Sequence, residues 1–101
     1  MSLDFLEKLV QEITQTYPVA RVILFGSRAR GDHDIRSDID LAIDAPELTQ
    51  ADWLRIIELV EEAPTLLPID CVLLQEASRE LVSKIEHYGV TLYERKANPH
   101  D

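Results

Sequence analysis

Two aspartates separated by one residue, Asp38 and Asp40, suggest chemistry more clearly than any other pair in this 101-residue sequence. They belong to an apolar run that begins at Ser37 and continues through Leu41 to Ile43, which predicts a strand. Because side chains alternate across a strand, both carboxylates lie on one face, roughly 6.7 Å apart at the backbone. Two divalent cations about 3.5–4 Å apart can clamp the attacking and leaving oxygens of phosphoryl or nucleotidyl transfer. Since hard cations prefer oxygen ligands, we expect Asp38 and Asp40 to bridge two Mg²⁺ ions.

Asp70 is the predicted third acidic ligand. It is the one acid inside the apolar run Ile69–Leu74, which predicts another strand, and this context argues that the side chain is shielded from solvent. A buried ionised carboxylate is costly unless it is paired or bound to a metal. We therefore expect Asp70 to bind one of the ions and to accept the proton of an attacking hydroxyl.

Each of these acids also has a simpler interpretation. An Asp-x-Asp taken alone is more often a solvated strand face, and Asp70 alone could be a sheet-edge residue with ordinary hydrogen bonds. Asp44 shares the face of Asp38 and Asp40 but lies farther along, so we assign it to the strand end or the turn. A small acidic cluster can also hold Ca²⁺ or Mg²⁺ in a purely structural role. The turn upstream of the acids favours a catalytic site instead.

That turn is Gly26-Ser27, which follows the apolar strand Val19–Phe25 and begins a short polar connector. Backbone N–H groups face outward at a turn that opens a helix, and they favour anions. Glycine allows close backbone approach, and the Ser27 hydroxyl can donate to a phosphate oxygen. Arg28 and Arg30 offer planar cations suited to phosphate. The alternative is a plain strand-to-helix turn whose surface arginines pair with nearby acids.

The rest of the sequence predicts the elements that hold these residues. Apolar residues at three- and four-residue spacings predict amphipathic helices, and β-branched runs between them predict strands. Their alternation predicts an α/β (α+β) fold, a small mixed β-sheet flanked by helices, as a single domain over 1–101 with 95–101 as a flexible tail. In order, the predicted elements are helix 3–16 with Ser2 as N-cap, strand 19–25, a short helix within 27–34, strand 37–43, a helix from Thr49, strand 69–74, a helix from Ser78 to a C′ glycine at Gly89, and strand 90–93. The predicted apolar face of the helix from Thr49 consists of Trp53, Leu54, Ile57, Val60 and Ala63. That of the helix from Ser78 consists of Leu81, Val82, Ile85 and Tyr88.

The composition limits the partners. Nineteen acidic against ten basic residues give a formal net charge of −9. Because nucleic-acid backbones are bound by Lys and Arg patches, we do not expect the chain to hold long DNA or RNA by itself, whereas a nucleotide held through metal ions or a basic protein partner is compatible. Cys71 is the single cysteine, so no intramolecular disulfide can form, and we expect it to be a small core residue on the sheet face opposite Asp70. The absence of a membrane-length apolar segment and of a signal-peptide pattern predicts a cytoplasmic protein with no membrane association.

The spacing of the motifs resembles a known signature. Gly26-Ser27, ten intervening residues and Asp38-x-Asp40 are similar to the signature of the DNA polymerase β-like nucleotidyltransferase superfamily. The fuller string GSRARG…SDIDL resembles the smallest members, the minimal nucleotidyltransferase (MNT) proteins, which include MntA-like antitoxins. The known partners of MNT proteins are HEPN-domain toxins of bacterial and archaeal toxin–antitoxin pairs. The resemblance implies a polymerase β-like fold and Mg²⁺-dependent transfer of a nucleoside monophosphate from an NTP to a hydroxyl.

The resemblance also implies roles for individual residues. The nucleotide-binding residues would be Gly26, Ser27, Arg28, Arg30 and Ser37, of which the first two hold the β- and γ-phosphates. The catalytic and metal-binding residues would be Asp38, Asp40 and Asp70, which together hold two Mg²⁺ ions.

Two functions from different classes follow from these observations. The first is transfer of AMP from ATP to a protein hydroxyl, such as a tyrosine of a HEPN toxin, which would make the chain a type VII-like antitoxin. The second is a non-catalytic antitoxin that neutralises a HEPN RNase by forming a complex with it. The net charge of −9 would suit docking on a basic surface of such an RNase.

Overall fold

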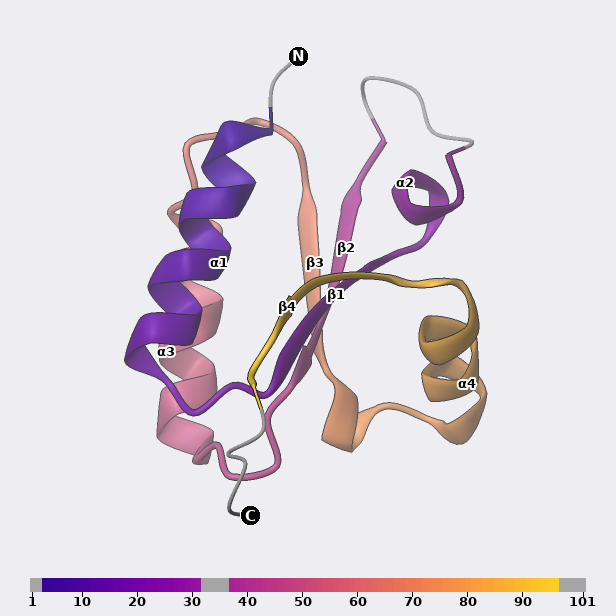
Figure 1. The fold of residues 1–101 in the computed structure, drawn as a ribbon. Helices are drawn as coiled ribbons and strands as arrows, with labels where there is room; N and C mark the ends of the chain where they lie inside the picture. Colours follow the sequence, from indigo (N-terminus) through magenta and orange to yellow (C-terminus); the bar gives the residue numbers. More distant parts are fainter. Residues whose placement is uncertain (1–2, 32–36, 97–101) are drawn as a thin grey trace.

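The computed structural model describes residues 3–31 and 37–96 of the chain. It confirms the predicted fold class and the predicted order of helices and strands (Figure 1). Ser2, the predicted first N-cap, and residues 32–34 of the connector lie outside the described residues. The elements are α1 Asp4–Thr16, β1 Arg21–Phe25, α2 Ser27–Arg30, β2 Ile39–Asp44, α3 Gln50–Glu61, β3 Ile69–Leu73, the 3₁₀ turn η1 Leu74–Glu76, α4 Arg79–Tyr88 and β4 Val90–Glu94.

The four strands form one mixed sheet in the order β3-β2-β1-β4. β1 runs antiparallel to both of its neighbours, β2 and β4, whereas β2 and β3 are parallel. The end of β1 and the starts of β2 and β3 therefore lie at the same end of the sheet. The register shows this directly, because Phe25 pairs with Asp40 and Asp40 pairs with Asp70. The topology thus brings the predicted turn beside the predicted acids.

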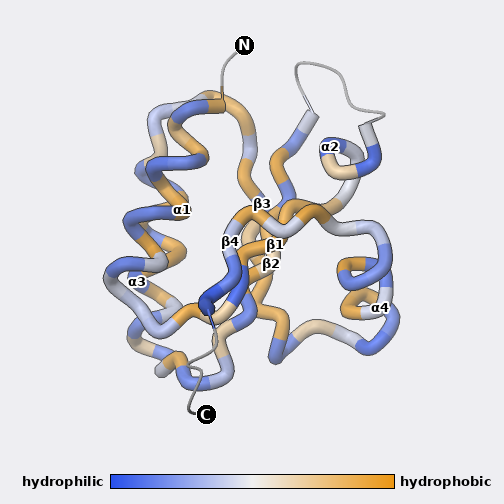
Figure 2. The backbone as a smooth tube through the Cα atoms, in the orientation of Figure 1, coloured by the Kyte–Doolittle hydropathy of each residue, from blue (hydrophilic) through white to orange (hydrophobic). Residues whose placement is uncertain are grey.

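The main core lies between one face of the sheet and the helices α1 and α3, which lie together on one side of the sheet (Figure 1). Ile13, Leu41 and Ile56 are completely buried there. Along α1 hydrophobic and hydrophilic positions alternate (Figure 2), as expected for a helix that covers a sheet with one side. On the opposite face, Ile85 of α4 belongs to a smaller buried cluster with Ile23. This second face also carries the polar side chains considered below.

The buried face of α3 matches the predicted one in part, because Trp53, Val60 and Ala63 pack against the main core as expected. Its N-cap is as expected, because the Thr49 hydroxyl accepts a hydrogen bond from the Asp52 amide at 3.1 Å. The residues that α3 buries completely or nearly so are Ile56 and Val60, and Leu54, predicted to be buried, is 55% exposed. The spacing of apolar residues permits two overlapping stripes along this helix, and packing against α1 and β3 selects the one through Ile56.

α4 begins as predicted and ends differently. The Ser78 hydroxyl caps it by accepting a backbone hydrogen bond at 3.1 Å. Tyr88, predicted on the buried face, is 60% exposed, and its ring meets that of His87 edge-on with a centroid distance of 4.5 Å. Gly89, the predicted C′ glycine, has φ −72°, a value that any residue adopts. Glycine is needed there for space, because an added Cβ would lie 2.5 Å from Cγ2 of Ile23. Within 3–31 and 37–96, no helix is both long and apolar enough to cross a membrane.

Candidate active site

The chain turns sharply at Gly26, between the end of β1 and the four-residue helix α2. Gly26 has φ +77° and ψ −155°, a combination that essentially only glycine adopts. A Cβ at this position would also collide with Oδ2 of Asp40. The backbone conformation alone therefore requires glycine here, and an added Cβ would in addition push the Asp40 carboxylate aside.

The start of α2 offers the groups expected of a phosphate-binding turn. Its first N–H groups have no partner within the helix, and the half-buried Ser27 is the first helical residue. Because α2 has four residues, its dipole adds little. An anion would be held by the N–H groups, by the Ser27 hydroxyl and by arginine. Gly31 ends α2 in the left-handed conformation, at φ +80°.

Asp40 is the centre of the acidic group. Both of its neighbours in β2 are completely buried in the main core, so alternation turns Asp40 to the other face of the sheet. Partial burial, and then the charges of Asp70 and Asp38, raise the pKa of Asp40 above its ordinary value of 3.8, whereas Arg30 lowers it. The structure therefore brings Asp38, Asp70 and Arg30 within electrostatic range of Asp40.

Asp70 lies beside Asp40 in the parallel pair of β2 and β3. The predicted shielding of Asp70 from solvent is wrong, because its side chain is exposed. The reason is the strand order, which places β3 at the edge of the sheet. An exposed carboxylate keeps its hydration, so burial no longer argues that Asp70 needs a metal. Its position next to Asp40 is the observation that still favours a shared site.

The three acids suit Mg²⁺ by their backbone positions. In the described part of the chain, no group of three or more His, Cys, Asp or Glu side chains lies close enough to hold a metal ion. However, three carboxylates at one end of one sheet face are the oxygen ligands that Mg²⁺ prefers. Adjacent strands lie about 4.8 Å apart and alternate residues about 6.7 Å apart, distances that Asp side chains can span by rotation. Asp38 and Asp70 are exposed and have room to rotate toward Asp40.

Arg28 and Arg30, predicted together as phosphate ligands, have different surroundings. Nε of Arg28 donates to the main-chain oxygen of Ser37 at 3.0 Å, in a partly buried hydrogen bond. This bond joins α2 to the residue that precedes Asp38. Arg30 is exposed, and its charge reaches Asp40. Arg28 thus has a structural contact that the sequence could not show, because the partner is a main-chain carbonyl nine residues away. Its role as a phosphate ligand stays a prediction.

Cys71 occupies the place predicted for it. It alternates with Asp70 along β3 and packs against the main core, on the face opposite the acids. Burial raises the pKa of its thiol to about 12, so the group is uncharged at neutral pH and unsuited to metal binding or nucleophilic chemistry.

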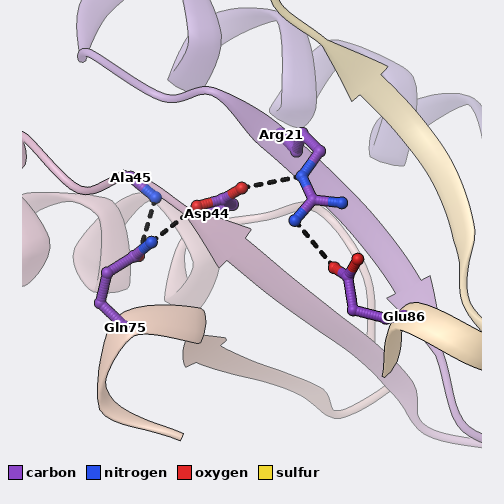
Figure 3. Close-up of polar contacts among 5 residues, drawn as sticks. All are labelled: Arg21, Asp44, Ala45, Gln75 and Glu86. Atoms are coloured by element: carbon purple, nitrogen blue, oxygen red, sulfur yellow. Dashed lines mark hydrogen bonds and ion pairs between the residues drawn. The ribbon is translucent and has the colours of Figure 1, made fainter. Parts of the chain in front are cut away.

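A polar network at the other end of the sheet was not anticipated from the sequence (Figure 3). Arg21 of β1 forms ion pairs with Asp44 at 2.7 Å and with Glu86 of α4 at 2.8 Å. Hydrogen bonds to Glu86 and to Asp44 raise the pKa of Arg21 above its ordinary value. Gln75 donates to Asp44 at 2.6 Å and accepts from the amide of Ala45 at 2.9 Å. These contacts confirm Asp44 as a strand-end residue, and they fasten η1 and α4 to the sheet.

Comparison with known proteins agrees with this fold. A family model described as "Polymerase beta, Nucleotidyltransferase" matches residues 7–98. A Methanocaldococcus jannaschii protein named "Putative protein adenylyltransferase MJ1215" is 32% identical over 75 residues, which cover 74% of this chain and 85% of that protein. A toxin–antitoxin crystal structure with AMP-PNP gives a TM-score of 0.68 at 23% identity, over 89% of this chain and 74% of the matched one. A tri-AMPylated Shewanella oneidensis HEPN toxin in complex with an MNT antitoxin gives a TM-score of 0.61 at 22% identity, over 88% and 70%.

The mixed sheet with its flanking helices is thus the fold of a nucleotidyltransferase. The chain belongs to the polymerase beta nucleotidyltransferase family, because the family model spans nearly all of it. The two solved structures, both less than 25% identical, show that the fold is shared with chains of toxin–antitoxin complexes.

Proposed function

We propose that this chain transfers AMP from ATP to a tyrosine hydroxyl of a HEPN-domain toxin and thereby acts as its antitoxin. The observation that carries the proposal is the packing of Gly26 against Asp40, because it joins a phosphate-binding turn to a carboxylate that has two others beside it. The relative named as a protein adenylyltransferase supports AMP as the group transferred and a protein as the acceptor. The tri-AMPylated HEPN toxin in a complex that contains this fold supports the kind of acceptor.

In this reaction the tyrosine oxygen attacks the α-phosphorus of ATP, the bond to the β-phosphate breaks, and pyrophosphate leaves. The backbone at Gly26 and the hydroxyl of Ser27 bind the β- and γ-phosphates. Asp70 accepts the proton of the attacking hydroxyl. Asp38, Asp40 and Asp70 are the residues that would hold Mg²⁺, which supplies charge neutralisation at the phosphates when it is bound.

Intact-mass measurement tests the proposal. The purified chain is incubated with the HEPN-domain protein from the same genome, ATP and Mg²⁺. We expect the HEPN protein to gain mass in units of AMP, and we expect Asp38→Ala to abolish the gain. Asp44→Asn is the matched control, because Asp44 is an acid on the same face of β2 whose contacts are structural. No gain with ATP, or an equal gain with Asp38→Ala, would refute the proposal.

A second candidate is a non-catalytic antitoxin, which the net charge of −9 favours because it suits docking on a basic RNase. The Asp38→Ala/Asp40→Ala double variant separates the two functions. If the folded double variant still neutralises the toxin fully, complex formation is sufficient. If neutralisation is lost while the complex persists, AMP transfer is required.

A further inference from the structure

A groove runs along α1 beside the edge strand β4, on the side of the sheet away from the acids, and it is apolar toward Leu3 and mixed in polarity toward Gln15. It consists of two hollows, of about 250 and 360 Å³, which share Glu7, Val10 and Leu92 in their linings. Leu3, the N-cap residue of α1, and Leu6 line the first hollow. The groove follows α1 from Leu3 to Gln15, a distance of about 18 Å at the rise of an α-helix.

The apolar wall formed by β4 exists because of a β-bulge. Val22 pairs with Tyr93 and Ile23 pairs with Thr91, so Leu92 is the extra residue between them. A bulge changes the direction of a side chain relative to strict alternation. Leu92 and Tyr93 consequently both line the groove, although they are consecutive residues of one strand. Leu92 is 38% exposed.

Three features indicate what the groove binds. Glu7 lines both hollows and is the one charged residue to do so among those that the structure describes. In a two-fold dimer across this surface, copies of an acidic chain would bring like charges together, which disfavours a second copy as the occupant. The bulge interrupts β4, and bulged edge strands resist the addition of another strand. A basic helix from a different protein meets neither obstacle.

We propose that the α1–β4 groove binds an amphipathic helix of a partner protein, with apolar side chains seated around Leu92 and a Lys or Arg facing Glu7. A groove about 18 Å long accommodates about twelve residues of such a helix. The proposal rests on the proposed function in one respect, namely that the helix belongs to the HEPN-domain acceptor. Because the groove and the acids lie on opposite faces of the sheet, a docked helix leaves the acids uncovered for another segment of the same partner.

The test measures the affinity of this chain for the HEPN-domain protein from the same genome by titration calorimetry. Leu92→Arg places a charge against the apolar wall, and Glu7→Lys reverses the charge of the groove. Leu66→Arg and Glu58→Lys are the matched controls, because both residues are exposed and lie away from the groove. We expect each groove variant to weaken Kd about tenfold or more, with wild-type thermal stability, and each control to leave Kd unchanged. Wild-type binding should also weaken as salt is added.

Wild-type affinity in both groove variants would overturn the proposal, and so would an absence of binding by the wild-type chain. A wild-type dimer that Leu92→Arg converts to a monomer would show that the occupant is a second copy, which also overturns it. The proposed function fails separately. If the groove variants lose binding while wild type transfers no AMP, the docking surface stands without the transferase. If the groove variants bind normally and AMP is transferred, the transferase stands without the docking surface.

Discussion

Replacing Gly26 with alanine should destabilise the protein more than replacing Gly31, although both glycines have positive φ. At Gly31, with φ +80° and no described atom within 4 Å of an added Cβ, the penalty is that of a left-handed alanine, about 1–2 kcal/mol. At Gly26 the backbone conformation costs about 1–3 kcal/mol. Displacing the Asp40 carboxylate, which is the end of a rotatable and partly exposed side chain, adds about 1 kcal/mol, the low end of the penalty for overpacking. We therefore expect the free energy of unfolding to fall by about 1–2 kcal/mol in Gly31→Ala and by roughly 2–4 kcal/mol in Gly26→Ala.

A double-mutant cycle isolates the part that comes from the contact with Asp40. Asp40→Ala removes the colliding carboxylate, and the remaining Cβ lies at an ordinary 3.4 Å from the Cβ added at Gly26. In this background Gly26→Ala should cost about 1 kcal/mol less than in wild type, whereas the cost of Gly31→Ala should stay the same. Urea unfolding of the set supplies the free energies. If the effects of Gly26→Ala and Asp40→Ala add to within about 0.5 kcal/mol, the close approach of turn and carboxylate is refuted.

Three further predictions concern single residues. Arg28→Lys should remove the hydrogen bond that joins α2 to the start of β2, so that kcat for AMP transfer falls and hydrogen exchange of the Ile39 amide becomes faster. The control Arg30→Lys should leave the exchange rate of the Ile39 amide unchanged. Equal exchange rates in both variants would contradict this role of Arg28. Folding raises the pKa of Asp40, so the ionised carboxylate disfavours the folded state. Asp40→Asn should therefore leave the free energy of unfolding unchanged below pH 3.8 and increase it progressively as pH rises through the raised pKa. An increase that does not depend on pH would contradict this. Cys71 should stay unmodified by a maleimide at neutral pH until the protein unfolds, since burial raises its pKa to about 12, and rapid labelling of the native protein would contradict this.

The sequence was informative about the local parts of the site. Alternation in a strand placed Asp38 and Asp40 on one face, and Gly26 marked a turn that other residues adopt with difficulty. What it could not show is that the turn and the second carboxylate touch. That contact depends on the antiparallel pairing of Phe25 with Asp40, which is a property of the sheet register. The hydrogen bond of Arg28 to a carbonyl beyond the connector has the same tertiary origin.

The incorrect predictions share a cause, which is that exposure depends on neighbours that a local pattern does not contain. The apolar run around Asp70 suggested a buried strand, but the strand order places β3 at the edge. Leu54 fits a helical stripe as well as Ile56 does, and packing against α1 decides between them. The bulge that directs Leu92 into the groove also follows from pairing between β1 and β4, with no proline or glycine at that point to announce it.

The claim that this site transfers AMP is tested most directly with ATP labelled at either the α- or the γ-phosphorus. Each is incubated with Mg²⁺, the HEPN-domain protein from the same genome, and either wild type or Asp38→Ala. The account predicts that the α-label becomes attached to the acceptor, that pyrophosphate is released in equal amount, and that Asp38→Ala stops both. Attachment of the γ-label, or of the α-label at the wild-type rate in Asp38→Ala, would contradict it.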